Sequence, residues 1–241
     1  MDGYIPSFND LAWGAFMYWV SSYGGNIGGD QAYVELFKAH DFLQELRQSP
    51  KRVTSASISK YLINFLNQWR CQLADSEVMA ERIREAIAGL TKSLRRFDTV
   101  TLLSIDMSAH KSLIKQMAAQ LDDVHGLGPT CTAKILHVLN PAVFVPWDKP
   151  IREAFWKYNH SRWYEDFLEY TQRAARDVRA DFKSFSSTDE PEVYLSRKLG
   201  YSPSKTLAKF LDEFLWIKIT KKMPIPPPWH PGMELAPCQP C

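Results

Sequence analysis

The sequence of 241 residues predicts an all-α protein. Apolar side chains recur every three or four residues along most of the chain, which is the spacing of one buried helix face. No segment alternates apolar and polar side chains for long enough to predict a strand. About ten amphipathic segments follow one another, so packed helices are the expected architecture.

The first predicted helix covers residues 9–23, where Leu11, Phe16, Trp19 and Val20 share one face before a Gly-Gly-Asn stop. The same spacing continues in the later segments, for example through Leu113, Met117 and Leu121. The other predicted helices are 30–48, 57–73, 76–97, 107–124, 129–139, 148–158, 161–182, 189–199 and 202–220. Residues 223–241 contain the run MPIPPPWHPG, whose prolines lack N–H donors, so this tail is expected to be extended or partly disordered.

Composition limits the classes of function. The formal net charge is only +2, so any nucleic-acid surface has to come from local clusters of Lys and Arg. The four cysteines (Cys71, Cys131, Cys238 and Cys241) are too scattered for a disulfide scaffold. Charged residues interrupt every apolar run, and the N-terminus has no basic leader, so no membrane partner is expected. A cytoplasmic protein associated with the bacterial nucleoid is the expectation.

Residues 121–152, LDDVHGLGPTCTAKILHVLNPAVFVPWDKPIR, contain the most specific pattern in the chain. An amphipathic run ends at Val124, Gly126-Leu127-Gly128 forms a hairpin, and Pro129 opens the next helix. The hairpin glycines are expected to adopt positive φ and to allow close approach of a partner. The helix that follows directs unpaired N–H groups outward, so a phosphate is the natural partner. Asp148 follows 18 residues after Thr130.

This pattern resembles the helix-hairpin-helix DNA glycosylases related to endonuclease III and to the 8-oxoguanine and alkyladenine glycosylases. The match is strong over about thirty residues, through the hairpin, Phe144-Val145-Pro146-Trp147-Asp148 and Ile151-Arg152. The resemblance implies two interlocked helical lobes with a helix-hairpin-helix motif and a cleft between them. One lobe would comprise residues 1–54 with 141–241, and the other residues 55–140. The implied partner is double-stranded DNA with an extruded base, bound by a monomer.

Asp148 matches the catalytic carboxylate of that family. A fixed negative charge near C1′ stabilises the oxocarbenium-like transition state and can orient the attacking water. The alternative is that Asp148 only caps the helix that begins near Lys149, a role that Asp fills readily. Bifunctional members carry a nucleophilic Lys at the position of Thr130, and threonine cannot form an imine. The resemblance therefore implies a monofunctional enzyme that uses water and leaves an abasic site.

The resemblance also implies how DNA is held. The N–H groups of Gly126, Gly128 and Thr130 would face phosphate, and Lys134, Lys149 and Arg152 are further candidate contacts. The carbonyls of Asp122, Val124 and Leu127 would hold a monovalent cation, K⁺ or Na⁺, that bridges to a phosphate. The alternative is a plain interhelical turn. No other cofactor is expected, because only Cys238 and Cys241 occupy the region where some relatives bind an iron–sulfur cluster.

An enzyme that extrudes a nucleotide has to fill the gap that it leaves in the stack. The end of the helix predicted over 57–73 offers Asn67 or Gln68 as this wedge, with Arg70 facing the opposite base, although a polar helix end is an equal alternative. The aromatic candidates for the base pocket are Trp147, Phe144, Trp13 and Tyr18, though aromatic residues at helical spacing are usually core.

Two functions of different classes remain. The first is a monofunctional DNA glycosylase that hydrolyses the bond to a damaged, mispaired or modified base. It would serve repair or, if the base is a hypermodified one of phage DNA, antiviral defence. The second is a non-catalytic helix-hairpin-helix DNA-binding protein in which Asp148 is only a helix cap. The sequence does not identify the base.

Overall fold

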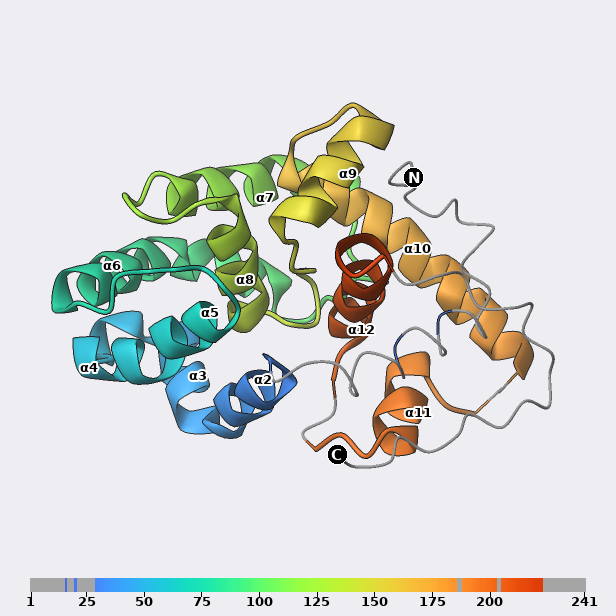
Figure 1. Ribbon diagram of the computed structural model, residues 1–241, viewed down its shortest axis with the longest axis horizontal. Helices are drawn as coiled ribbons and strands as arrows, with labels where there is room; N and C mark the ends of the chain where they lie inside the picture. Colours follow the sequence, from blue (N-terminus) through green and yellow to red (C-terminus); the bar gives the residue numbers. More distant parts are fainter. Residues whose placement is uncertain (1–15, 17–19, 21–28, 186–187, 203–204, 223–241) are drawn as a thin grey trace. The chain divides into compact units, whose positions relative to one another are not determined.

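The computed structural model describes residues 16, 20, 29–185, 188–202 and 205–222, and every regular element in them is helical (Figure 1). No strand occurs in these ranges, which confirms the all-α class. The predicted helix over 9–23 and the proline-rich tail from residue 223 lie almost wholly outside them. None of the described helices is both long enough and apolar enough to cross a bilayer.

Contacts divide the chain into two compact units. The central unit is Gly28–Pro146, and the terminal unit combines Met1–Ile27 with Trp147–Cys241. The sequence placed the first boundary near residue 54, but residues 28–54 pack within the central unit. Tyr33, for example, stacks on Trp69 with ring centroids 5.9 Å apart. Aromatic burial of this kind attaches the segment to the central helices.

The central unit is built from helices that follow one another with short connections. They are α2 (Gly29–Lys38), α3 (His40–Gln48), η2 (Pro50–Arg52), α4 (Ser55–Ser57), η3 (Ile58–Ile63), α5 (Asn64–Gln68), α6 (Glu77–Leu94), η4 (Arg95–Phe97), α7 (Met107–Asp122) and α8 (Pro129–Leu139). The run α4–η3–α5 ends five residues before its predicted end, because Arg70 and Gln72 adopt positive φ.

Helix α8 is the centre of this unit and packs against α3 and α7 (Figure 1). All residues from Cys131 to Asn140 are buried. His137 donates from Nδ1 to the Phe144 carbonyl (2.6 Å), and its Nε2 lies 3.3 Å from the Tyr33 hydroxyl. Asn140 donates to the Phe97 carbonyl (3.0 Å). These bonds satisfy the polar groups of His137 and Asn140 and fix the position of the C-terminal end of α8.

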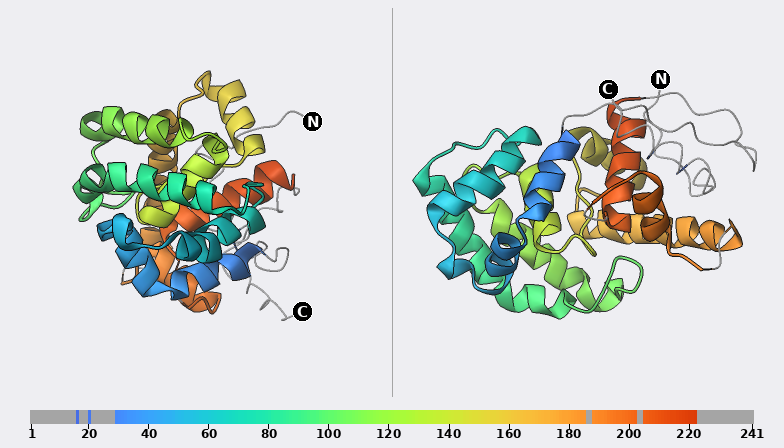
Figure 2. Two further views of the ribbon diagram at one scale, coloured as in Figure 1. Left: turned by 90° about the vertical axis from the view of Figure 1, so that its left-hand side faces the viewer. Right: turned by 90° about the horizontal axis from the view of Figure 1, so that it is seen from below.

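The described part of the terminal unit from Trp147 onward contains four α-helices and a π-helical turn. They are α9 (Lys149–Asn159), α10 (Tyr164–Phe185), α11 (Pro191–Lys198), α12 (Leu207–Leu215) and η5 (Trp216–Thr220). Helix α12 packs against α10 and α11 and continues directly into η5, which packs against α9 (Figure 2). The start of η5 changes the helical register, so its last residue, Thr220, reaches the first turn of α9.

A cluster of buried charges lies along α12 and just before it. The Lys205 ammonium is 2.7 Å from Glu213 Oε1, and Lys209 is 2.9 Å from Asp212 Oδ2 and 3.1 Å from Glu213 Oε1. The side chains of both lysines and of Glu213 are fully buried. Burial raises the pKa of the neighbouring Tyr164 well above its usual value, and the charge of Asp212 adds to this shift.

Candidate functional site

The turn between α7 and α8 is a tight reversal of the backbone. The Leu127 N–H donates to the Val124 carbonyl (2.9 Å), and Gly126 has φ +95° at the third position of this turn. A positive φ there is what a type II turn requires, and glycine adopts it without strain. The buried Leu127 side chain and a 2.5 Å bond from the Thr132 hydroxyl to Asp122 Oδ1 fix the turn to both helices. The prediction of positive φ is confirmed at Gly126.

That prediction is wrong at Gly128. Its φ of −125° and ψ of 173° are extended, because this residue is the N-cap of α8 and not part of the reversal. No side chain caps α8, and a Cβ built on Gly128 meets nothing within 4 Å. Pro129 occupies the first helical position, so the first-turn N–H groups of Thr130 and Cys131 follow an open cap.

Cys131 lies just behind this open cap and is buried. The pKa of Cys131 is lowered to about 7, chiefly by the hydrogen bond with the Cys71 thiol. The Gly128 N–H and the Lys134 ammonium also lower this pKa, whereas burial raises it. The same shared bond and burial raise the pKa of Cys71. The Gly128 N–H is therefore directed at a sulfur atom of α8, whereas the sequence predicted that it faces a phosphate.

Lys134 does not lie where a phosphate could reach it. Lys134 is only 7 % exposed, and its ammonium donates to the Trp69 carbonyl. The same ammonium lies 5.5 Å from the centroid of the Trp69 ring. The predicted contact with DNA is thus replaced by a bond that fixes the end of α5 to α8. The reason is that the fold covers α8 on all sides from Cys131 to Asn140, so a lysine in this stretch is buried and bonds within the protein.

Gly128→Asp is expected to keep or raise stability and to weaken duplex DNA binding by tenfold or more. Aspartate is a favoured N-cap in extended backbone, and its carboxylate would accept the first-turn N–H groups of α8. The same charge would repel a phosphate. Fluorescence anisotropy with a labelled duplex measures the affinity, and Thr99→Asp on the exposed loop after η4 controls for the added charge. Equal affinities of the wild type and Gly128→Asp would contradict a phosphate site at this helix start.

Asp148 is held at both carboxylate oxygens within the terminal unit. Oδ1 accepts the N–H of Ile151 (2.9 Å), which makes Asp148 the N-cap of α9, and Oδ2 accepts the Thr220 hydroxyl (2.9 Å). The residue is half-buried. The backbone therefore fixes one oxygen and the end of η5 fixes the other, so the carboxylate has one defined orientation. Sequence reasoning missed Thr220, because 72 residues separate the pair and no local pattern marks it.

Lys149 and Arg152 follow Asp148 on the first turn of α9. The Lys149 side chain is 72 % exposed and lies 3.7 Å from Glu153, a surface pair that contributes little stability. Arg152 is half-buried. Both cations are therefore near the placed carboxylate and accessible, in contrast to Lys134.

The two wedge candidates, Asn67 and Gln68, and the nearby Arg70 differ in their surroundings. Asn67 uses both ends of its amide on Leu73: its Oδ1 accepts the Leu73 N–H (2.6 Å) and its Nδ2 donates to the Leu73 carbonyl (3.0 Å). The Asn67 side chain thus holds the loop after α5 in place through two hydrogen bonds. Gln68 and Arg70 are exposed, and Arg70 has φ +62°. Asn67 cannot enter a base stack without losing its two hydrogen bonds to Leu73. The exposed side chain of Gln68 can do so without losing these bonds.

The two described aromatic candidates for the base pocket are core residues. Phe144 is fully buried, 5.4 Å from the Phe97 ring in the central unit. Trp147 is 2 % exposed in the terminal unit, with its ring 5.0 Å from Phe167 and 5.3 Å from Tyr164. Neither is among the residues that line the pocket of the central unit, because the side chains of the apolar run 143–147 are buried. Trp13 and Tyr18 lie outside the described residues.

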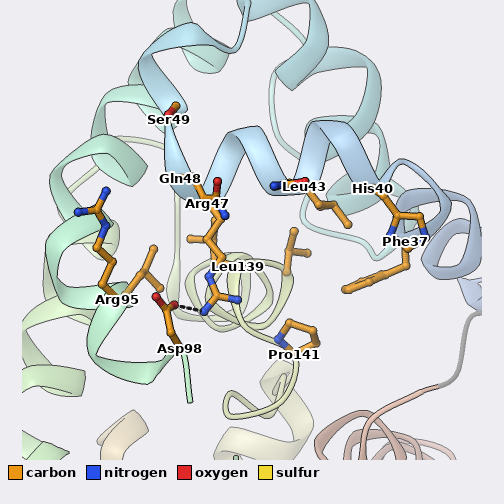
Figure 3. A pocket seen from close by; sticks show the side chains of 13 residues that line it. Phe37, His40, Leu43, Arg47, Gln48, Ser49, Arg95, Asp98, Leu139 and Pro141 are labelled. Carbon is orange, nitrogen blue, oxygen red and sulfur yellow. Dashed lines mark hydrogen bonds and ion pairs between the residues drawn. The ribbon is translucent and has the colours of Figure 1, made fainter. Parts of the chain in front are cut away.

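A pocket of about 760 Å³ opens on the central unit (Figure 3). Its lining combines apolar side chains, among them Phe37 and Leu139, with the Arg47–Asp98 ion pair (2.5 Å). The volume is in the range of small-molecule sites. Of the predicted catalytic, wedge and base-pocket residues that the structure describes, none lines this pocket.

The three carbonyls predicted to bind a cation belong to the α7–α8 turn. The Val124 carbonyl already accepts the Leu127 N–H, and that of Asp122 lies at the C-terminal end of α7, where carbonyls extend beyond the helix. Neutral carbonyl oxygens suit a monovalent ion. Among the described residues, no group of three or more His, Cys, Asp or Glu side chains is placed to hold a metal ion.

Comparisons with protein-family models, with curated proteins and with solved structures find no match to this chain.

Proposed function

We propose that this protein is a monofunctional DNA glycosylase, which hydrolyses the N-glycosidic bond of a damaged, mispaired or modified base and leaves an abasic site. The observation that carries the proposal is the Asp148 carboxylate, fixed by the Ile151 N–H and the Thr220 hydroxyl at the start of α9. It follows, at the family spacing, a Gly-Leu-Gly turn that opens an uncapped helix. In the proposed enzyme, the turn contacts the DNA backbone and the carboxylate acts at C1′ of the extruded nucleotide.

The chemistry follows from the charge that develops when the bond breaks. The deoxyribose becomes positive as the base departs, and an oriented carboxylate stabilises that charge. Asp148 has this orientation because both of its oxygens are held. It would also direct a water molecule toward C1′. Thr220 is a positioning residue in this scheme, since it acts only through Asp148.

The α7–α8 turn would supply the anchor on the DNA backbone. The N–H groups of Thr130 and Cys131 at the open start of α8 suit a phosphate, and the exposed Gly126 allows close approach. A monovalent cation would be held by the carbonyls of Asp122, Val124 and Leu127 and would add positive charge beside the phosphate. Lys149 and Arg152 are the further cations that we propose touch DNA.

Base extrusion needs a side chain that enters the stack. We assign this role to Gln68, with Arg70 toward the opposite base, because both are exposed while Asn67 holds the loop. The base pocket is not assigned, since Phe144 and Trp147 are core residues.

A second candidate is a DNA-binding protein without catalysis. One observation favours it: Asp148 is a helix N-cap with good geometry, and that role alone accounts for an aspartate before Lys149-Pro150. Capping does not account for the Thr220 bond to the second oxygen. DNA binding by the wild type without base release from any substrate would select this candidate.

Wild-type protein is expected to yield unbroken strands with abasic sites that break only on alkali or heat. Thr130 has no amine, and the nearby Lys134 ammonium is bonded to the Trp69 carbonyl, so neither forms a Schiff base with C1′. Gel analysis with and without alkali measures the product, and borohydride is expected to trap no protein–DNA adduct. A trapped adduct would show a bifunctional enzyme.

A further inference from the structure

The end of α9 and the turn that follows it carry an unusual group of exposed side chains. Among the described residues, five large apolar side chains are exposed, and three of them lie within residues 156–163. These are Trp156 (45 % exposed), Tyr158 (36 %) and Trp163 (56 %). Large exposed aromatic rings that gather in one segment mark an interaction surface. We call residues 156–163 the aromatic turn.

The backbone of the aromatic turn is well defined. His160 ends α9 with φ +54°, and its N–H donates to the Trp156 carbonyl (2.9 Å). The Ser161 hydroxyl then accepts the Trp163 N–H (3.2 Å) and donates to Asp166. These bonds satisfy the polar groups of the turn and hold its backbone in one conformation. In that conformation the aromatic rings are exposed.

Cations accompany the rings. The Arg162 guanidinium lies 3.7 Å from the centroid of the Trp156 ring, and the Lys157 ammonium lies 5.4 Å from that of Tyr158. Residues 149–163 contain four Lys or Arg and one Glu, an excess of three positive charges in a chain whose net charge is +2. The single acid, Glu153, is already paired with Lys149.

We propose that the aromatic turn binds single-stranded DNA by stacking unpaired bases on Trp156 and Trp163 while Lys157 and Arg162 contact the backbone. Stacking on an aromatic ring tolerates any base, and the cations supply the attraction to phosphate. A guanidinium plane against an indole ring extends the flat surface on which a base can lie. The positive excess favours a polyanion over a neutral apolar peptide. The inference rests on the proposed function only for the choice of DNA as the nucleic acid.

The test is fluorescence anisotropy of a labelled twelve-residue oligothymidylate with the full-length protein. Trp156→Leu and Trp163→Leu are each expected to weaken binding by about tenfold, since leucine keeps an apolar side chain but removes the stacking face. Trp156→Phe keeps a ring and is expected to stay within a few-fold of the wild type. Arg162→Gln is expected to lower the slope of log affinity against log salt by about 0.7. Val193→Ala, at an exposed apolar residue of α11 outside the turn, is the control for surface changes.

Two outcomes would overturn the inference: no binding of the oligonucleotide by the wild type, or equal affinities of the wild type and the Trp→Leu variants. The proposed base-release activity is measured separately on duplex DNA. Asp148→Asn should still bind the oligonucleotide, so loss of one property does not imply loss of the other. Thermal unfolding of each variant confirms that it is folded.

Discussion

Asp148→Asn is expected to lower base release by several orders of magnitude while stability and DNA affinity change little. The loss is large because the variant lacks the negative charge that stabilises the oxocarbenium-like transition state. Asparagine is an N-cap as good as aspartate, so the bond from the Ile151 N–H to Oδ1 is retained. The Thr220 hydroxyl can reverse its role and accept from the new amide. The substitution thus removes the negative charge of Asp148 while it keeps the size of the side chain and its hydrogen bonds.

Single-turnover excision on duplex DNA measures the effect, with thermal unfolding and duplex affinity measured on the same preparations. Thr220→Val is the matched control, because it keeps the shape at η5 and removes only the second bond to Asp148. Its excision rate is expected to fall far less than that of Asp148→Asn. Wild-type activity in Asp148→Asn would leave Asp148 as a helix cap and remove the catalytic role.

Lys209→Met is expected to destabilise the protein by about 3–5 kcal/mol, the range for breaking a buried ion pair by removing one partner. Lys209 bonds to both Asp212 and Glu213 in the buried cluster of α12, and its side chain is fully buried. Without it, two carboxylates share the single ammonium of Lys205. The low dielectric of the interior makes that excess charge costly. Urea denaturation followed by circular dichroism measures the change.

Two further variants test the cause. Lys209→Met with Asp212→Asn restores equal numbers of positive and negative charges in the cluster and is expected to recover much of the loss. Arg197→Gln removes the exposed Arg197–Asp189 pair and is expected to cost less than about 1 kcal/mol. If Lys209→Met were no more harmful than Arg197→Gln, the cluster would have no structural role.

The sequence predicted a structural element well where the element depends on neighbouring residues alone. Pro129 and the apolar spacing after it predicted a helix over 129–139, the bounds of α8. The reversal at Gly126 was also predictable, because a turn with positive φ needs glycine. The prediction for Gly128 was wrong because the second glycine of a Gly-x-Gly motif can also be an N-cap in extended backbone. The sequence does not distinguish this conformation from a positive φ.

Features that depend on packing could not be predicted. The sequence of α12, LAKFLDEFL, is typical of an amphipathic helix, yet all nine of its residues are buried. Its charged side chains form ion pairs in the protein interior. The spacing of Lys209 from Asp212 and Glu213, three and four residues, was the available signal. Lys134 carried no such signal, because its burial depends on neighbouring segments that cover α8 on all sides. Thr220 reaches Asp148 only through the fold of the terminal unit.

The most direct test of the proposed activity is mass spectrometry of free bases released from DNA by the wild-type protein. The substrates are alkylated, oxidised and mispaired duplexes and phage genomic DNA with hypermodified bases, each also incubated with Asp148→Asn. The expected result is one class of free base released by the wild type alone, with an equal number of abasic sites in unbroken strands. Binding of these DNAs by the wild type with no base released from any of them would contradict the glycosylase and leave a DNA-binding protein.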